Sequence, residues 1–144
     1  MTHQSRALSD QSQYTARAVQ TASPGQLVVM LYDGMIRFLG KAKAGFASGA
    51  PGDAGLALGR AQAICTELRV SLDMTQGEIA ANLAGIYDWI SEEMTAARLD
   101  QDVQRIDRML PMIADLREAW AQIANTPKPQ TGAGRPVVGV NLAG

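Results

Sequence analysis

The stretch TASPGQLVVMLYDGM, residues 21 to 35, opens with the signals that start a helix and continues into five consecutive apolar residues. The Ser23 hydroxyl can accept a hydrogen bond from a free backbone N–H of a first helical turn. Pro24 suits the first helical position, and Gln26 completes a Ser-x-x-Gln capping box. This boundary predicts a helix that begins at Ser23.

Apolar residues recur along the same segment at spacings of four and three, which is the period of one helix face. They are Leu27, Leu31, Gly34, Phe38 and Lys41 or Ala42. The pattern predicts a helix that ends near FASGAPGD and turns this stripe toward a core. A glycine inside a helix costs about 1 kcal/mol relative to alanine, so we expect a neighbouring helix to approach closely at Gly34.

Three further segments repeat this periodicity, and short breaks separate them. The second begins near Asp53 and carries Ala57, Ala61, Ile64, Leu68 and Ser71 or Leu72. The third follows Gly77 and carries Ile79, Leu83, Ile86, Ile90, Met94 and Ala97. The fourth follows Asp100, an expected cap, and carries Val103, Ile106, Leu110, Ile113, Leu116, Trp120 and Ile123. Short connections between helices of about 20 residues favour antiparallel neighbours, so the sequence predicts an all-α, antiparallel up-and-down four-helix bundle over residues 23–125.

Pro111 lies inside the fourth segment, where proline removes a backbone donor and crowds the preceding turn. The apolar stripe continues on both sides of it. We therefore expect one kinked helix here rather than two separate helices.

The two ends of the chain differ in composition from the bundle. Residues 1–22 are polar, and the pattern indicates a flexible arm with Leu8, Tyr14 and Val19 as apolar anchors. Residues 126–144 are rich in proline and glycine, which neither a helix nor a packed core accommodates easily. We expect a flexible tail there.

Composition limits the class of protein. A chain of 144 residues is the size of one domain, and its formal net charge of -1 favours neither nucleic acid nor an anionic membrane as partner. Cys65 is the only cysteine, which suits a reducing compartment. No signal peptide is recognisable, and no apolar run approaches the roughly 20 residues of a membrane span. The sequence predicts a soluble cytoplasmic protein that does not insert into membranes.

Candidate catalytic and metal-binding residues are scarce. His3, the only histidine, lies in the arm, so a di-iron bundle, a zinc site and a Ser–His–Asp triad all lack their ligands or base. Cys65 adjoins the second stripe, where we expect a buried, inert thiol. Asp33 lies four residues before Arg37, a spacing typical of a surface ion pair. We expect no enzyme, no cofactor and no metal.

The first helix carries more apolar residues than one face of a bundle can bury. The surplus set is Val28, Met30, Tyr32, Met35, Ile36 and Leu39. In the third helix, Tyr87 and Trp89 also lie off the predicted stripe. Two interpretations stay open: scattered exposed apolar groups beside a wide stripe, or grooves between helices that receive a partner.

Several segments of the chain resemble the FliS family of flagellar secretion chaperones. They are YTARAVQTASPGQLVVMLYDGMIR (14–37), ICTELRVSLD (64–73), GEIAANLAGIYDWI (77–90) and LREAW (116–120). The resemblance implies a helical bundle that binds the disordered C-terminal segment of flagellin, prevents premature polymerisation and aids delivery to the type III export apparatus. It also implies contact with an export-gate component, and an arm that folds over a groove until flagellin displaces it.

The resemblance also selects candidate residues. Those expected to bind flagellin are Tyr14, Leu27, Tyr32, Ile36, Leu83 and Tyr87, with Tyr32, Ile36, Leu83 and Tyr87 expected to line grooves. Those expected to serve the fold are Ser23, Pro24, Leu31, Gly34, Asn82 and Trp120, with Leu31 and Trp120 in the core. We expect a monomer or a weak homodimer. The alternatives are a self-associating structural bundle and, with less support, a small bundle enzyme.

Three features depart from the family pattern. Pro111 interrupts a helix that the family usually continues with aliphatic residues, Arg98 occupies a position where asparagine is usual, and the tail is unusually rich in proline and glycine. With these departures, the shape of a groove near the fourth helix need not follow the family pattern, whereas the expected class of function is unchanged.

Overall fold

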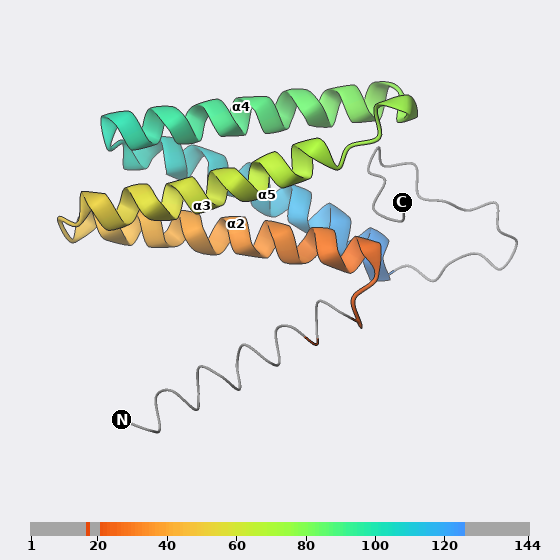
Figure 1. The fold of residues 1–144 in the computed structure, drawn as a ribbon, viewed down its shortest axis with the longest axis horizontal. Coiled ribbons are helices and arrows are strands. Elements are labelled where there is room, and N and C mark those ends of the chain that lie inside the picture. The colour runs from red at the N-terminus through yellow and green to blue at the C-terminus, as the bar shows by residue number, and fades with distance from the viewer. Residues whose placement is uncertain (1–16, 18–20, 126–144) are drawn as a thin grey trace, which may run out of the picture.

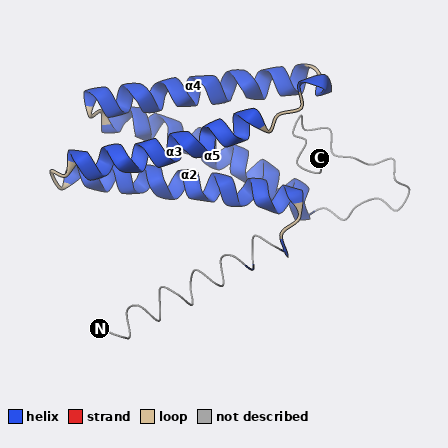
Figure 2. Cartoon of the chain, in the orientation of Figure 1, coloured by secondary structure: helices blue, strands red, loops and turns tan. Residues whose placement is uncertain are grey.

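The computed structural model describes residue 17 and residues 21–125, and these residues form a bundle of four long helices. The helices are α2 (Pro24–Ala47), α3 (Pro51–Val70), α4 (Glu78–Asp100) and α5 (Val103–Asn125), with one turn of 3-10 helix, η1 (Met74–Gln76), before α4. Each helix runs antiparallel to the next, and α5 returns to pack against both α4 and α2 (Figure 1). Helices and the turns that connect them make up the described part of the chain (Figure 2). The predicted all-α, up-and-down four-helix bundle is confirmed.

The start of α2 follows its sequence signal. The Ser23 Oγ accepts from the Gln26 backbone N–H at 3.2 Å, and the Gln26 Oε1 accepts from the Ser23 backbone N–H at 2.9 Å. Pro24 occupies the first turn. These two reciprocal hydrogen bonds satisfy groups that would otherwise lack partners at a helix start, so the capping box is confirmed.

The start of α5 differs from its prediction. Gln101 adopts a left-handed backbone conformation with φ 52°, which ends α4 just after Asp100. The side chain of Asp102, rather than Asp100, then accepts from the Gln104 N–H at 2.9 Å. The expectation that Asp100 caps this helix is therefore wrong by two residues.

The core face of α2 is rotated from the predicted stripe. The buried residues that recur along its core face are Val28, Tyr32, Met35, Leu39 and Ala42. Leu27, Leu31 and Phe38 are half-buried, so the expectation of a core position for Leu31 is only partly met. Gly34 is buried at the boundary with α3, where a Cβ would lie 3.1 Å from the Ile64 Cδ1. The close approach predicted at Gly34 is confirmed, and Gly34 and Phe38 of the predicted stripe face α3.

The core face of α4 is shifted in its first half. Its buried residues are Ala80, Ala84, Tyr87, Ile90, Met94 and Ala97. Leu83 and Ile86 are half-buried, and Ile79 is 44% exposed. The predicted stripe therefore describes the core only from Ile90 onward, and its earlier residues lie toward the surface.

Pro111 lies within α5, and the helix continues on both sides of it as one element. Pro111 is exposed, whereas Met109 and Ile113 on either side of it are buried. The proline ring therefore replaces a backbone donor on the solvent side of the helix. The prediction of a single helix is confirmed.

Candidate functional site

Tyr32 of α2 and Tyr87 of α4 meet inside the bundle. They are 0% and 1% exposed, and their hydroxyl oxygens are 2.6 Å apart. The expectation that they line a surface groove is wrong. Each hydroxyl gives the other a hydrogen-bond partner, which removes the main penalty for burying a tyrosine. Their aromatic rings can then serve as core side chains.

Cys65 of α3 joins the same buried cluster. Its Sγ donates to the Tyr87 carbonyl oxygen at 3.3 Å. Burial raises the pKa of the Cys65 thiol to about 11 and the pKa of Tyr87 to about 12, and it raises the pKa of Tyr32 as well. The buried position predicted for the Cys65 thiol is confirmed, and the raised pKa supports the expectation that the thiol is unreactive.

An apolar groove runs between α4 and α5. Its volume is about 170 Å³, and its lining residues are Ile79, Leu83, Leu116, Ala119, Trp120 and Ile123. Ile79 and Leu83 are one turn apart on α4, so they form one wall. Ala119 is exposed and has a small side chain, which leaves space between the larger side chains around it. Every lining side chain is apolar apart from the indole nitrogen of Trp120.

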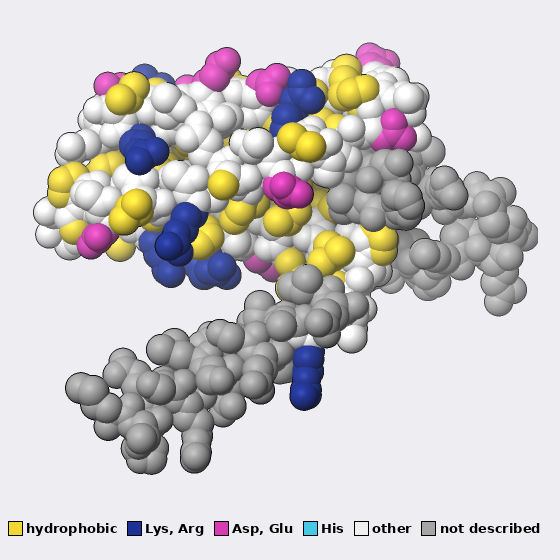
Figure 3. All heavy atoms as spheres, viewed as in Figure 1, with side chains coloured by type: hydrophobic (Ala, Val, Ile, Leu, Met, Phe, Trp, Pro, Cys, Tyr) yellow, Lys and Arg dark blue, Asp and Glu magenta, His cyan; other side chains and the backbone are white. Residues whose placement is uncertain are grey.

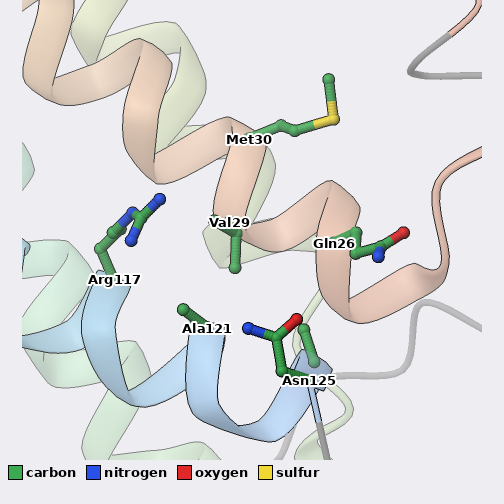
Figure 4. Close-up of a pocket in the computed structure, with 7 residues that line it drawn as sticks. Gln26, Val29, Met30, Arg117, Ala121 and Asn125 are labelled. Carbon is green, nitrogen blue, oxygen red and sulfur yellow. The ribbon is translucent and has the colours of Figure 1, made fainter.

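A second groove lies on the other side of α5, against the start of α2. Its volume is about 320 Å³, and its lining residues are Gln26, Val29, Met30, Arg117, Ala121, Ala124 and Asn125. Val29 and Ala121 face each other from the two helices, with Gln26 and Asn125 at one end and Arg117 at the other (Figure 4). This groove has an apolar middle and polar ends.

Asp33 and Arg117 connect α2 to α5 beside this second groove. The Arg117 Nε donates to the Asp33 Oδ1 at 2.8 Å, and its Nη2 donates to the Asp33 Oδ2 at 3.4 Å. The expected ion pair of Asp33 with Arg37 is therefore wrong. The Asp33 carboxylate makes a two-point contact with the guanidinium of Arg117, 84 residues later in the chain, instead of pairing with Arg37 one turn along α2.

The structure separates the other predicted site residues. Leu83 lies in the α4–α5 groove, whereas Leu27 and Ile36 are half-buried on α2. Asn82 is exposed, and Tyr14 lies outside the described residues. Trp120 is 6% exposed, so its core position is confirmed, and it also contributes to the groove.

The groove residues that the site prediction omitted are mostly members of the predicted core stripes. Ile79, Leu116 and Ile123 were expected to be buried, yet they line the groove. A sequence signal was present, because Ala119 places a small residue beside these large ones on α5. A small residue between large side chains at an interhelical boundary is compatible with a surface groove.

The described helices contain no cluster of three or more His, Cys, Asp or Glu side chains arranged to hold a metal ion. None of these helices is long and apolar enough to cross a membrane.

Comparison with known proteins defines the family. The model of the family described as flagellar protein FliS matches residues 7–127. The chain belongs to the FliS family. It is 37% identical over 109 residues to the flagellar secretion chaperone FliS of Salmonella typhimurium, an alignment that covers 74% of this chain and 81% of that protein.

Two other FliS relatives support the same family membership. The flagellar secretion chaperone FliS of Vibrio cholerae is 36% identical over 106 residues, which cover 73% of this chain and 78% of the relative. That of Bacillus subtilis is 30% identical over 128 residues, which cover 86% of this chain and 96% of the relative. The alignments thus extend over most of each protein, which supports the role of a flagellar export chaperone.

Proposed function

We propose that this protein is a cytoplasmic chaperone for flagellin, and that the α4–α5 groove receives apolar side chains from the C-terminal segment of flagellin. Membership of the FliS family supports a role in flagellar export. The observation that carries the proposal is the groove itself, whose lining from Ile79 to Ile123 is apolar and open at the surface.

The size of the groove fits side chains better than a small molecule. Pockets for small molecules usually measure about 300–1,000 Å³, whereas this groove measures about 170 Å³. An amphipathic segment presents apolar side chains at spacings of three and four residues, which match the rows of side chains along a helix groove. Leu116, Ala119 and Ile123 form such a row on α5. A client that becomes helical on binding can therefore place side chains along this groove.

The α2–α5 groove offers a second contact for the same client. The two grooves lie on opposite sides of α5, and both lie in its C-terminal half. A flexible client that wraps around α5 would occupy both and would become ordered on binding. Its apolar segments would then be masked against premature polymerisation until delivery to the export apparatus and its gate component.

Titration calorimetry of the whole protein with a peptide of the C-terminal segment of flagellin from the same bacterium tests this function. We expect a saturable one-to-one isotherm with a negative heat-capacity change, because apolar surface becomes buried. Absence of both heat and complex formation would contradict flagellin as the client. An increase in particle size with protein concentration alone would favour the self-associating bundle instead.

A pair of matched variants tests the groove. Ala119→Glu places a charge in the α4–α5 groove, whereas Ala114→Glu places the same charge at an exposed position on α5 that lines neither groove. We expect Ala119→Glu to weaken flagellin binding at least tenfold, because its carboxylate would be desolvated among apolar groups. Ala114→Glu should leave the affinity unchanged. Equal affinities for the two variants would remove the α4–α5 groove from the binding site.

A further inference from the structure

Three basic side chains surround one aromatic ring on the side of the bundle formed by α2 and α3. The Phe38 ring centroid lies 5.3 Å from the Arg37 Cζ, 5.5 Å from the Lys41 Nζ and 5.8 Å from the Arg60 Cζ. Arg37 and Lys41 belong to α2, and Arg60 belongs to α3. We call these four residues the Phe38 cluster.

The packing of α2 on α3 builds the cluster. A Cβ at Gly34 would lie 3.1 Å from the Ile64 Cδ1 and 3.9 Å from the Arg37 Nη2. The Arg37 side chain therefore folds back across the seam, over a position that has no side chain. Arg60 precedes Ile64 by one turn on α3, so its guanidinium approaches the same ring from the other helix.

The three cations of the cluster have no acidic partner among the described residues, where no carboxylate forms an ion pair with any of them. Asp33, the acid one turn before Arg37, is paired with Arg117 instead. Like charges four residues apart, as in Arg37 and Lys41, repel each other and disfavour the helix that carries them. This arrangement adds unfavourable repulsion that an anionic partner would relieve.

The ring gives the cluster an apolar centre. Phe38 is half-buried and packs against the bundle core, while Arg37, Lys41 and Arg60 are exposed around it. Figure 3 shows Lys and Arg side chains gathered along the edge of the bundle where α2 and α3 lie. The surface therefore combines positive charge at its rim with an aromatic group at its centre.

The geometry points to the Phe38 cluster as a docking surface for an acidic segment of a second protein partner. Carboxylates of that segment would pair with Arg37, Lys41 and Arg60, and an apolar side chain would contact the Phe38 ring. Three cations are few for nucleic acid, since proteins that depend on phosphate contacts commonly neutralise about 6–10 of them. Polybasic sequences that bind anionic lipid usually contain about 4–8 basic residues.

The cluster is separate from both grooves beside α5. No residue of the Phe38 cluster lines either groove. The cluster lies between α2 and α3, whereas one groove lies between α4 and α5 and the other between α2 and α5. A client held beside α5 therefore leaves the cluster accessible. The acidic partner and the client can bind the same molecule of this protein at the same time.

An NMR titration of the full-length protein tests this surface with two short synthetic peptides. One contains glutamates and aspartates around a single leucine, and the other contains the corresponding glutamines and asparagines. We expect the acidic peptide to produce saturable shifts at Arg37, Phe38, Lys41 and Arg60 that weaken as salt increases, because salt screens exposed charges. Shifts confined to other residues, or equal shifts with the neutral peptide, would overturn the proposal.

Two triple variants with the same change in charge control for general electrostatics. Arg37→Gln/Lys41→Gln/Arg60→Gln removes the cations of the cluster, whereas Arg69→Gln/Arg98→Gln/Arg108→Gln removes three cations elsewhere. We expect the first to weaken acidic-peptide binding at least tenfold and the second to leave it within twofold. Equal losses would show diffuse attraction and contradict a defined surface.

Further measurements separate this surface from flagellin binding and from other anions. The first triple variant should retain its calorimetric affinity for the flagellin peptide, and loss of that affinity together with intact folding would contradict two separate surfaces. Tighter binding of a DNA duplex or of phosphatidylserine vesicles than of the acidic peptide, at the same four residues, would overturn the class of partner. If flagellin fails to bind while the acidic peptide binds the cluster, only the flagellin proposal fails.

Discussion

The two sides of the bundle pack differently. On the side of α3, helices approach closely at small residues: a Cβ at Gly45 of α2 would lie 3.0 Å from the backbone N of Ala54. On the side of α5, one such close approach, between Gly25 and Ala124, is accompanied by ion pairs of long side chains, as in Asp33–Arg117 and Glu93–Arg105. Grooves remain beside α5 at both of its boundaries.

Side-chain size and position decide where a helical bundle leaves space at its surface. Small residues at the contact between two helices bring the backbones together, as at Gly45 and Ala54, and leave little space there. A small residue at the surface between larger side chains, such as Ala119 beside Leu116 and Ile123, leaves an apolar groove open instead. A helical chaperone can therefore place its rigid part and its binding part in one small bundle.

The largest effect should come from titrating Cys65 of α3 in the buried cluster that it forms with Tyr32 and Tyr87. The Cys65 thiol has a pKa of about 11 in the folded state and an ordinary value of 9.0. Between these values the unfolded state loses the proton while the folded state keeps it, so the free energy of unfolding decreases as pH rises from 9 to 11. Two pKa units correspond to about 2–3 kcal/mol. Urea unfolding measured across this range checks the expected loss.

The variant Cys65→Ala serves as the control for this titration. It removes the thiol, so its free energy of unfolding should decrease less steeply between pH 9 and 11 than that of the wild type. Burial raises the pKa of both Tyr32 and Tyr87, so these two tyrosines contribute to the decrease above pH 10 in both proteins. Identical slopes for the two proteins would show that Cys65 does not titrate in this range.

The tyrosine pair should give the next largest effect. Tyr32→Phe or Tyr87→Phe leaves the remaining hydroxyl buried without its 2.6 Å partner, which should lower the free energy of unfolding by about 1–3 kcal/mol. The double variant should lose less than the sum of the two, because no unpaired hydroxyl remains. Urea unfolding of all four proteins measures this coupling, and additive losses would mean that the two hydroxyls act independently.

Two glycines of α2 give the smallest effect and the sharpest test of close packing. Gly45→Ala introduces a Cβ 3.0 Å from the Ala54 backbone N, and we expect a net loss of about 1 kcal/mol from overpacking. Gly40→Ala has no atom within 4 Å of its new Cβ and should increase the free energy of unfolding by about 0.5–1 kcal/mol through helix propensity. Thermal unfolding of both variants gives the sign. Stabilisation by both would show that α2 and α3 separate readily.

Local signals predicted the helices. The capping box at Ser23 and the apolar periodicity act within one or a few turns, so they indicated where α2 starts and how many helices follow. The fourth helix was predicted to continue through Pro111 because its stripe continued, and α5 does so. The flexible arm (residues 1–22) and the flexible tail (residues 126–144) remain predictions, since these segments lie almost wholly outside the described residues.

The orientation of the helices about their own axes could not be read from the same signals. α2 carries two adjacent apolar stripes, and periodicity alone fits the one with Leu31 as well as the one with Tyr32. Their positions off the predicted stripes favoured the surface for Tyr32 and Tyr87. Their pairing across 55 residues reversed that preference, and the same rotation moved Ile79 from the predicted core to the groove.

The sequence by itself therefore determined the number and direction of the helices and the start of α2, because these depend on residues close together in the chain. Only the tertiary structure decided which apolar face became core, which acid paired with Arg117 and where grooves remained. These outcomes depend on partners from other helices. A buried polar group is stable only when its partner is present, and that partner is brought near by the fold.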